Sequence, residues 1–442
     1  MDKKIIEFAK NLQARTVERR RDFHRYAEAA WTEFRTAAAV ADALTALGYQ
    51  VQAGAEVVAA EAMMGVPPDR ELQEHMQRAL EQGANPAWVE KMRGGRTGVV
   101  GILEFAKPGP TVALRFDMDA NDVAETEEPG HRPCREGFAS VNKGVMHACG
   151  HDGHTAVGLT VAEMLANLRD ELSGRIKLIF QPAEEGVRGA KAMMVKGVVD
   201  DVDVILGMHF GINLRKTGQV ACRTEGFLAT TKLDAEFSGV PAHAGAAPET
   251  GRNALLAAAA ATLNLHAISR HSQGASRINV GVLTAGSGRN VIPARALLKL
   301  ETRGATSAIN EYMVGEAVRI IEAAAAMYDV KLAVSEMGGA AGCENDPELV
   351  ARVRQVAQRL NLFTSILPAG NIGGSEDCTY LMERVQQHGG KAAYIMVGTE
   401  LAAGHHDDRF DFNEDALVFA SALLAGAAVD LLEIPLTATP AP

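Results

Sequence analysis

The chain has no basic run, no disulfide framework and no internal repeat, and these absences narrow what it can do. Its 442 residues carry a net charge of −11, whereas nucleic acids and anionic membranes are bound by clustered lysine and arginine. We therefore expect no nucleic acid and no membrane as partner, and a small molecule instead. The five cysteines are odd in number and widely spaced, which favours buried thiols over disulfides.

The N-terminal segment also lacks the pattern of a signal peptide. It reads MDKKIIEFAKNLQARTVERRRD, which is charged and amphipathic, and no apolar run approaches the ~20 residues needed to cross a bilayer. The predicted location is the cytoplasm. Hydrophobic residues make up 47% and charged residues 22% of the chain, an ordinary globular balance, and the length predicts two or three domains.

What the sequence does contain is a dense cluster of metal-ligand types, the octapeptide HACGHDGH. His147, Cys149, His151 and His154 lie within these eight residues. Residues two apart on an extended or turning segment share a face, so Cys149 and His151 can converge on one ion. The apolar pattern of residues 155–168 predicts a buried helix directly after the cluster. A lone Cys-x-His pair would more often be inert, but four such side chains together favour a metal site.

Three apolar segments, each predicted as a strand, are followed directly by further ligand types. These are 111–116 with Asp117 and Asp119, 175–181 with Glu184 and Glu185, and 202–208 with His209. The alternation of strands and helices predicts an α/β fold with a mostly parallel sheet and helices on both faces. In such a sheet the carboxyl ends of the strands lie at one edge, where α/β proteins place their sites.

The remaining pattern predicts the domain organisation. Residues 4–48 read as one long or two broken helices that include Glu28, Trp31 and Glu33, and residues 53–95 read as an insertion with a helix at 70–81. From 231 to 335 the order β-α-β-β-α-β predicts a ferredoxin-like α+β domain. The expected organisation is a discontinuous metal-binding domain, 1–227 and 337–442, interrupted by a domain at 228–336. The C-terminal PLTATPAP is expected to be disordered.

The collected candidates suit hydrolysis assisted by two metal ions. They are Cys149, His151, Glu184, Glu185, His209 and one of His405 or His406, with Asp117 close by. Five mixed ligands and a spare carboxylate fit two Zn²⁺ or Mn²⁺ ions ~3.5–4 Å apart. One acid of the Glu184–Glu185 pair can bind metal while the other acts as general base in cleaving an amide or ester. Taken alone, the acid pair would more often be an exposed loop.

Several motifs resemble those of the M20 metallopeptidase and amidohydrolase family, in particular its aminoacylase and indole-acetyl-amino-acid hydrolase branch. The motifs are RFDMDA, MHACGHDGHTA, IFQPAEEG, GMH, PAHAG, GSGRNVIPA and GHHDDRFDF, and the resemblance covers essentially the whole chain. It implies metal ligation by Cys149, His151, Glu185, His209 and His406, with Glu184 as the base. His406 is preferred over His405 because the last ligand of the family stands four residues before a Phe, here Phe410.

The resemblance also shows two departures from the wider family. Arg115 stands where the first strand usually carries a ligand His, while Asp117 remains, so Asp117 is expected to orient a neighbouring ligand rather than to bind metal. Asp407 and Asp408 replace the usual Ser-Pro after the last His. These departures bear more on the substrate than on the metal.

For the inserted domain, the resemblance implies a lid and dimerisation role. His243 would reach across a dimer interface to stabilise the oxyanion, and Asn290 and Arg303 would bind the α-carboxylate of the substrate. From the sequence alone, a surface-turn His, a turn Asn and a strand-end Arg are equally good interpretations.

The implied activity is hydrolysis of the amide bond of an N-acyl amino acid with two divalent ions, Mn²⁺ or Zn²⁺. The leading substrate is p-aminobenzoyl-glutamate, and indole-3-acetyl-aspartate or another aryl-acyl amino acid is the alternative. A homodimer or a heterodimer with a homologous second subunit is expected. The alternative of another class is a non-catalytic metal-binding partner subunit; Glu184 argues against it, because a structural site needs no spare base.

Overall fold

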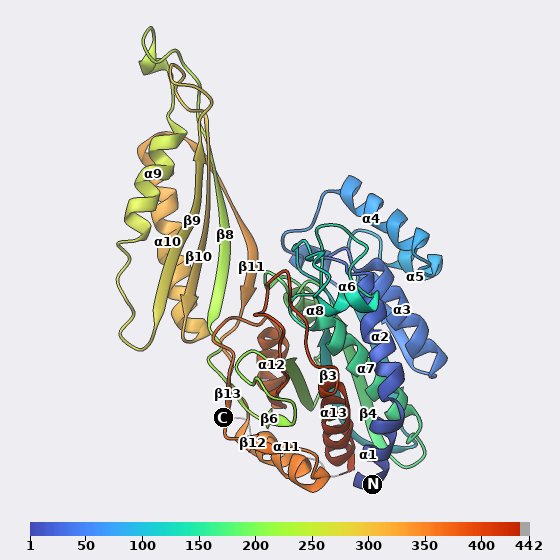
Figure 1. Ribbon diagram of the computed structural model, residues 1–442. Coiled ribbons are helices and arrows are strands. Elements are labelled where there is room, and N and C mark those ends of the chain that lie inside the picture. Colours follow the sequence, from blue (N-terminus) through green and yellow to red (C-terminus); the bar gives the residue numbers. More distant parts are fainter. Residues whose placement is uncertain (434–442) are drawn as a thin grey trace. The chain divides into compact units, whose positions relative to one another are not determined.

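Residues 1–433 are described by the computed structural model, and they fall into two compact units (Figure 1). The first unit comprises residues 1–226, 344–373 and the chain from 377 onward, and the second comprises 227–343 and 374–376. The roles expected for these parts, catalytic and lid, stay predictions. Residues 435–442, for which disorder is expected, lie outside the described residues.

The first unit is built on a mixed sheet that has eight strands within residues 1–433, in the order β1-β2-β4-β3-β5-β14-β6-β12. The strands are β1 (Gln50–Ala53), β2 (Val99–Glu104), β3 (Lys107–Asp117), β4 (Ser173–Gln181), β5 (Val204–Phe210), β6 (Gln219–Ala221), β12 (Ser365–Leu367) and β14 (Lys391–Val397). The central strands β4, β3, β5 and β14 are parallel, whereas β1, β2 and β6 pair antiparallel with their inner neighbours. Two further short strands, β7 (Thr224–Glu225) and β13 (Gly370–Asn371), pair with each other.

The parallel centre of this sheet explains why three predicted strands converge. Every residue of β5 is buried, as expected of a strand covered on both sides. In the register of the sheet, Asp117 of β3 lies opposite Gln181 of β4, and Arg115 lies opposite Gly207 of β5. The carboxyl ends of the three strands therefore meet at one edge. The predicted parallel core is confirmed, although the outer strands β1 and β2 run against it.

The first unit also contains helices, some of which pack against this sheet and others on neighbouring helices. They are α1 (Asp2–Asn11), α2 (Gln13–Arg25), α3 (Phe34–Ala46), α4 (Asp69–Glu81), α5 (Pro86–Lys91), α6 (Arg132–Glu136), α7 (His151–Ala166), α8 (Ala190–Val195), α11 (Pro347–Leu360), α12 (Cys378–Gln387) and α13 (Ala416–Glu433). Helices α7 and α13 contact each other and β3, and α12 contacts α8, β5 and β14. Within residues 1–433, α13 alone has the length and composition of a membrane span, but 83% of that window is buried inside the protein. Such burial is typical of a core helix.

The N-terminal region differs from the prediction of one or two helices over 4–48. It forms three helices, and Glu28, Trp31 and Glu33 lie in the connection between α2 and α3 rather than inside a helix. Trp31 adopts a left-handed φ of 66°, which a helix cannot contain. The Glu28 carboxylate accepts hydrogen bonds from the first-turn amides of Arg35 and Thr36, at 3.1 and 2.8 Å, and so caps α3. Glu28, which the sequence predicts to lie within a helix, therefore stabilises the start of the following helix, α3.

The segment predicted as an insertion carries its predicted helix and one more. Helix α4 begins at Asp69, one residue before the predicted start, and α5 follows, with Asn85 capping its first turn. Single turns of 3-10 helix, Gly54–Glu56 and Ala60–Ala62, precede them. The segment packs on α3, and the carbonyl of Met64 accepts a hydrogen bond from the Trp31 indole at 2.8 Å.

The second unit has the predicted β-α-β-β-α-β order. Its elements are β8 (Ala229–Ser238), α9 (Ala254–Leu265), β9 (Ser276–Ala285), β10 (Arg295–Gly304), α10 (Ser307–Met327) and β11 (Lys331–Ala340). All pairs in its sheet, ordered β11-β8-β10-β9, are antiparallel. Helices α9 and α10 pack on each other and on the sheet over a core that includes Phe237 and Leu298. Strand β9 forms an edge on which Val282 and Leu283 are exposed.

Candidate metal centre

The octapeptide HACGHDGH begins helix α7 earlier than predicted. The helix starts at His151, directly after Gly150, whose φ of 93° lies in the left-handed region. The prediction that the cluster precedes the helix is therefore wrong for His151 and His154, which occupy its first turns. Gly153 is required there by close packing, because a Cβ would lie 2.6 Å from the Phe412 ring.

The imidazole of His151 is oriented by a backbone carbonyl. His151 Nδ1 lies 2.9 Å from the carbonyl oxygen of Asp119, and a carbonyl only accepts, so Nδ1 carries the proton. Nε2 is then the atom with a free lone pair. It is buried and has no hydrogen-bond partner among the described residues. This arrangement is the one expected of a histidine whose Nε2 binds a metal ion.

His209 has the same orientation, and its free nitrogen faces Cys149. Its Nδ1 donates to the carbonyl of Phe210 at 2.8 Å, and its Nε2 lies 3.5 Å from Cys149 Sγ. Burial and the charge of Glu185 raise the pKa of the Cys149 thiol to about 12. A thiolate at this position therefore needs a cation beside it.

Glu184 and Glu185 lie on a strained loop that follows β4. Ala183, Gly186 and Val187 all have a positive φ, of 53°, 85° and 59°, which costs about 1–3 kcal/mol at each non-glycine position. The amides of Glu184 and Glu185 donate to the two carboxylate oxygens of Asp119, at 2.9 and 2.8 Å. The loop is therefore held against β3, and its strain is offset by these charge-assisted hydrogen bonds.

The two acid side chains differ in their surroundings. Glu185 Oε1 is buried and without a hydrogen-bond partner among the described residues, and its nearest cationic neighbour is His406 Nε2, at 3.3 Å but without hydrogen-bond geometry. Glu184 Oε2 lies 4.0 Å from His151 Nε2. Burial opposes ionisation of Glu185, but His406 and His151 outweigh it and lower its pKa to about 2. Glu185 is thus ionised and underpaired.

The adjacent histidines His405 and His406 are distinguished by their contacts. His405 Nε2 accepts a hydrogen bond from the amide of Ile212 at 3.0 Å, and its Nδ1 faces Cys149 Sγ at 3.5 Å, so neither nitrogen is open. Burial lowers the pKa of His405 to about 3. His406 is exposed, and its Nε2 is directed at Glu185. These contacts favour His406 as the ligand, as the resemblance implies.

Asp117 has both carboxylate oxygens occupied. Oδ1 accepts from His154 Nδ1 and Oδ2 from Arg115, both at 2.6 Å, and Oδ2 lies 3.7 Å from His151 Nε2. Burial opposes its ionisation, but the neighbouring His151, His154 and Arg115 hold its pKa well below the usual range. His154 in turn accepts the amide of Phe210 at its Nε2, so its two nitrogens are used. These contacts suit an orienting role for Asp117.

The predicted ligands fall into overlapping groups. In each group the ligand atoms lie within 4.8 Å of one another: Cys149, His151 and His209; Cys149, Glu185 and His406; His151, Glu184 and Glu185. Two unpartnered buried atoms, His151 Nε2 and Glu185 Oε1, occur within these groups, and such atoms are rare in proteins. Nitrogen, thiolate and carboxylate donors of this kind suit Zn²⁺ or Mn²⁺. The residues present therefore fit divalent metal ions, with Cys149 a member of two of the groups.

His147, the first histidine of the octapeptide, lies apart from these groups. Its ring is buried 6.2 Å from the ring of His24, measured between centroids, and both nitrogens lack a partner among the described residues. Burial lowers its pKa to about 3, so the ring is neutral and packs as part of the core.

Several supporting residues were missed by sequence reasoning because they come from distant segments. Glu33 accepts from the amide of Ala183 at 2.8 Å, and Asp377 accepts from the amides of Gly189 and Ala190 at 3.0 and 2.9 Å, so both hold the loop of Glu184. Burial and the nearby Asp119 raise the pKa of Glu33 to about 8. Asp119, which binds the amides of Glu184 and Glu185, is the supporting residue that the sequence does indicate, because it lies two residues after Asp117 at the end of a predicted strand.

Beneath the start of α7 lies a buried charge cluster that the sequence did not indicate. Arg20 is fully buried and pairs with Asp152 at 2.7 Å, Asp411 at 2.8 Å and Glu414 at 3.2 Å. His24 Nδ1 also lies 2.8 Å from Asp152. Since Asp152 directly follows His151, the cluster fixes the first turn of the helix that carries this candidate ligand.

The residues of the second unit that are predicted to contact substrate, His243, Asn290 and Arg303, make local contacts and belong to none of the metal-ligand groups. His243 Nδ1 accepts from the amides of Gly245 and Ala246, at 3.2 and 3.1 Å, and His243 forms an isolated bridge with Val291. The carbonyl of Asn290 accepts from the amide of Ala244 at 3.0 Å, so His243 and Asn290 lie on neighbouring segments. Arg303 pairs with Glu301 at 2.9 Å. The three residues remain candidates for substrate contacts.

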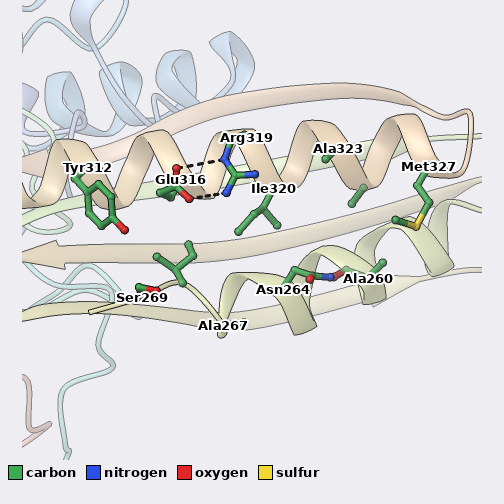
Figure 2. Close-up of a pocket in the computed structure, with 12 residues that line it drawn as sticks. Ala260, Asn264, Ala267, Ser269, Tyr312, Glu316, Arg319, Ile320, Ala323 and Met327 are labelled. Atoms are coloured by element: carbon green, nitrogen blue, oxygen red, sulfur yellow. Dashed lines mark hydrogen bonds and ion pairs between the residues drawn. The ribbon is translucent and has the colours of Figure 1, made fainter. Parts of the chain in front are cut away.

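A hollow of about 410 Å³ also lies in the second unit, between α9 and α10 (Figure 2). Its lining includes Ile320, Met327 and Tyr312, together with the ion pair of Glu316 and Arg319. Its lining residues include no His or Cys, in contrast to the metal-ligand groups of the first unit. The metal-ligand groups of the first unit, rather than this hollow, therefore form the candidate functional site.

Comparison with known proteins places this geometry in context. Residues 113–430 match Peptidase family M20/M25/M40. The chain is 52% identical over 427 residues to one of the subunits of p-aminobenzoyl-glutamate hydrolase from Escherichia coli (strain K12), and 51% identical over 427 residues to indole-3-acetyl-aspartic acid hydrolase of Enterobacter agglomerans. Each alignment covers 96% of this chain and 98% of the relative. The crystal structure of an aminobenzoyl-glutamate utilization protein from Klebsiella pneumoniae superposes with a TM-score of 0.83 at 43% identity, covering 96% of this chain and 97% of that one.

Proposed function

Because the chain belongs to Peptidase family M20/M25/M40, we propose that it is a di-metal amidohydrolase that cleaves p-aminobenzoyl-glutamate into p-aminobenzoate and glutamate. The observation that carries the proposal is the position of Glu184 beside a buried, underpaired donor set. Glu184 Oε2 lies 4.0 Å from His151 Nε2, and its neighbour Glu185 has a buried oxygen with no hydrogen-bond partner among the described residues. The identities to two hydrolases of acyl amino acids support the same reaction class.

Five side chains would hold the two ions, manganese or zinc. They are Cys149, His151, Glu185, His209 and His406. When bound, such ions polarise the scissile carbonyl and make water more acidic. The backbone carbonyls of Asp119 and Phe210 hold the two imidazoles with Nε2 outward, and Asp117, bound to Arg115 and His154, presents a fixed negative charge beside His151.

Glu184 would act as the general base and acid. Its carboxylate accepts the proton of the attacking water and later delivers it to the nitrogen of the leaving amino acid. The Asp119 carboxylate fixes the amide of Glu184 at 2.9 Å, so the side chain leaves the backbone at a defined place. The adjacent acids thus divide their roles: Glu185 binds metal, and Glu184 moves the proton.

The second unit would supply the substrate contacts. His243 is proposed to donate to the developing oxyanion from a neighbouring chain, with Asn290 and Arg303 binding the α-carboxylate. Arg303 now pairs with Glu301 at 2.9 Å, so a substrate carboxylate would replace one carboxylate partner by another. The exposed edge strand β9 supports pairing of this unit with a second copy.

The partner is proposed to be a second copy of the chain or a homologous second subunit. The Escherichia coli relative is named as one subunit of its hydrolase, which favours the latter. The cytoplasm stays the location that the sequence predicts. The catalytic domain is proposed to comprise residues 1–227 and 337–442, with the lid at 228–336.

The second candidate substrate is indole-3-acetyl-aspartate, favoured by the 51% identity to an enzyme named for it. The deciding experiment is turnover by the purified chain, loaded with Mn²⁺ or Zn²⁺, of both compounds and a small panel of acyl-glutamates and acyl-aspartates. Release of p-aminobenzoate that depends on metal and disappears in Glu184→Gln is the expected result. Stoichiometric metal without turnover of any compound would overturn the proposal and favour a non-catalytic role.

A further inference from the structure

Arg188 lies three residues after Glu185 on the strained loop. Its Nε donates to the carbonyl of Glu185 at 2.9 Å, and its Nη1 donates to the carbonyl of Gly65 at 3.3 Å. The side chain folds back across Gly186, where a Cβ would lie 2.9 Å from Arg188 Nε. The guanidinium is therefore half-buried and held at the base of the loop that carries Glu184 and Glu185.

The guanidinium of Arg188 has an orientation but no counter-charge. No carboxylate among the described residues lies within 4.0 Å of it, whereas the buried Arg20 and Arg115 each pair with two or more acids. A guanidinium has five N–H donors, of which the two carbonyls use two. Because carbonyl oxygens do not neutralise its charge, the remaining fork is suited to a planar carboxylate that arrives from outside.

The proposed substrates leave one carboxylate without a partner. The names of the two relatives have a dicarboxylic amino acid in common, glutamate in one and aspartate in the other. Asn290 and Arg303 are proposed for the α-carboxylate, so the side-chain carboxylate needs another cation. That carboxylate is only a few bonds from the scissile amide and must be bound close to Glu184.

Resting on the proposed function, we propose that Arg188 binds the side-chain carboxylate of a glutamyl or aspartyl substrate and so determines the preference for acidic amino acids. The inserted segment would also contribute to this binding. Gly65 belongs to that segment, and the neighbouring Met64 carbonyl is tied to the Trp31 indole at 2.8 Å. The segment therefore braces the guanidinium, which reduces the entropy lost when substrate binds.

Arg215 is the rival for this role. It lies close enough to His405 to contribute, after burial, to the lowered pKa of that ring, and it has no ion pair among the described residues. It is, however, exposed and not held by a hydrogen bond in the described part of the chain. A preorganised donor loses less freedom on binding than a mobile one, so Arg188 is the better anchor.

The test compares p-aminobenzoyl-glutamate with p-aminobenzoyl-glutamine, which replaces the side-chain carboxylate by an amide of the same shape. The metal-loaded wild-type enzyme should prefer the acid by roughly 10- to 100-fold in kcat/KM, the range for one hydrogen bond to a charged group. Arg188→Gln should bring this ratio close to one, mainly by loss on the glutamate substrate. Arg188→Lys, which keeps the charge without the fork, should retain part of the preference. Arg93→Gln, on the inserted segment and paired with the exposed Glu90, is the matched control.

The outcomes separate this inference from the proposed function. If the wild-type enzyme hydrolyses neither compound, the proposed function itself fails. If it hydrolyses both without preference, or if Arg188→Gln slows both equally at unchanged metal content, Arg188 is a structural clamp and the inference is wrong. Loss of the ratio in Arg215→Gln rather than in Arg188→Gln would assign the role to Arg215.

Discussion

Most candidate residues of the first unit lie in a buried cluster, whereas in the second unit His243 and Asn290 are exposed and Arg303 is half-buried near the end of β10. Cys149, His151 and His209 are buried with their ligand atoms within 4.8 Å of one another. His243 is exposed and makes only local hydrogen bonds, and Arg303 pairs with a residue two positions away on its own strand. The candidate ligands of the first unit are thus largely preorganised within one chain, whereas the candidates of the second unit are not brought together in the same way.

The difference agrees with the roles proposed for the two sets of residues. A divalent ion requires several donors at fixed positions, and the candidate ligands are carried by strand ends and a helix start and are held by second hydrogen bonds. A substrate must enter and leave, so the groups that bind it need exposure. Burial and unpartnered atoms therefore identify metal ligands well and substrate-binding residues poorly.

The largest effect on activity should come from changing Glu184, because proton transfer would be lost. The variant also separates proton transfer from metal binding within one pair of adjacent acids. Glu184→Gln should keep both ions and lower kcat by about 10²–10⁴-fold, the usual contribution of a general acid or base. Glu185→Gln is the matched control and should lose metal, because its buried oxygen belongs to the donor set. Metal analysis and steady-state kinetics measure both variants. Activity of Glu184→Gln within a few-fold of wild type would contradict the assignment.

The next effect concerns the support beneath the first unit's cluster. Arg20→Met removes the buried cation that pairs with Asp152, Asp411 and Glu414, and we expect about 3–5 kcal/mol of destabilisation because buried carboxylates lose their partner. Arg15→Met is the control, since its ion pair with Glu163 is exposed on the arginine side and should contribute about 1 kcal/mol or less. Urea unfolding of the two variants gives the comparison. Equal midpoints would show that the buried cluster does not stabilise the start of α7.

How far the sequence predicts these two regions depends on how local the information is. The parallel strands and the ligand types at their ends could be predicted, because apolar runs followed by acids and histidines are a local pattern. The start of α7 could not, because the apolar pattern that predicts the helix begins only at residue 155. Gly153 is required by the packing of Phe412, a residue far along the chain.

The supporting contacts were not predictable for the same reason. Glu33 reaches the amide of Ala183, and Arg20 reaches Asp411 and Glu414, across sequence separations that no local pattern encodes. Glu28 was expected inside a helix because its surroundings are helical in composition. Its carboxylate instead caps the start of α3, which only the tertiary arrangement reveals.

The second unit would be part of an active site if one of its residues acted on a substrate bound by another chain. If His243 of one chain stabilises the oxyanion in another, His243→Ala should lower kcat by roughly 10²–10³-fold, the value of one such donor. Mixing His243→Ala with Glu184→Gln chains should then restore partial activity, because a hybrid dimer contains one site with both residues intact. Verified subunit exchange without recovery, or an active monomer, would return His243 to an ordinary surface-turn residue.

The smallest effect is the pH dependence of the charge cluster that supports the first unit. Burial opposes ionisation of Asp411 and Glu414, but Arg20, Arg132 and, for Glu414, Arg21 lower the pKa of both below their ordinary values of 3.8 and 4.5. Carboxyls with a lowered folded pKa contribute stability above the unfolded pKa and lose it as the pH falls through the folded value.

His24 titrates in the opposite sense within the same cluster. Burial lowers its pKa, but hydrogen bonds to Asp152 and Glu125 outweigh burial and raise it above 6.5. Its contribution is therefore complete below about pH 6.5 and is lost as the pH rises through the folded value. Stability should thus fall on both sides, below about pH 4.5 through the acids and above about pH 6.5 through His24. Thermal unfolding between pH 3.5 and 8 (roughly spanning both windows) measures this pH dependence of stability. In His24→Gln the alkaline limb, the loss of stability above about pH 6.5, should become flatter, whereas the acid limb, the loss below about pH 4.5, should remain. An alkaline limb of unchanged slope in that variant would show that His24 is not its source.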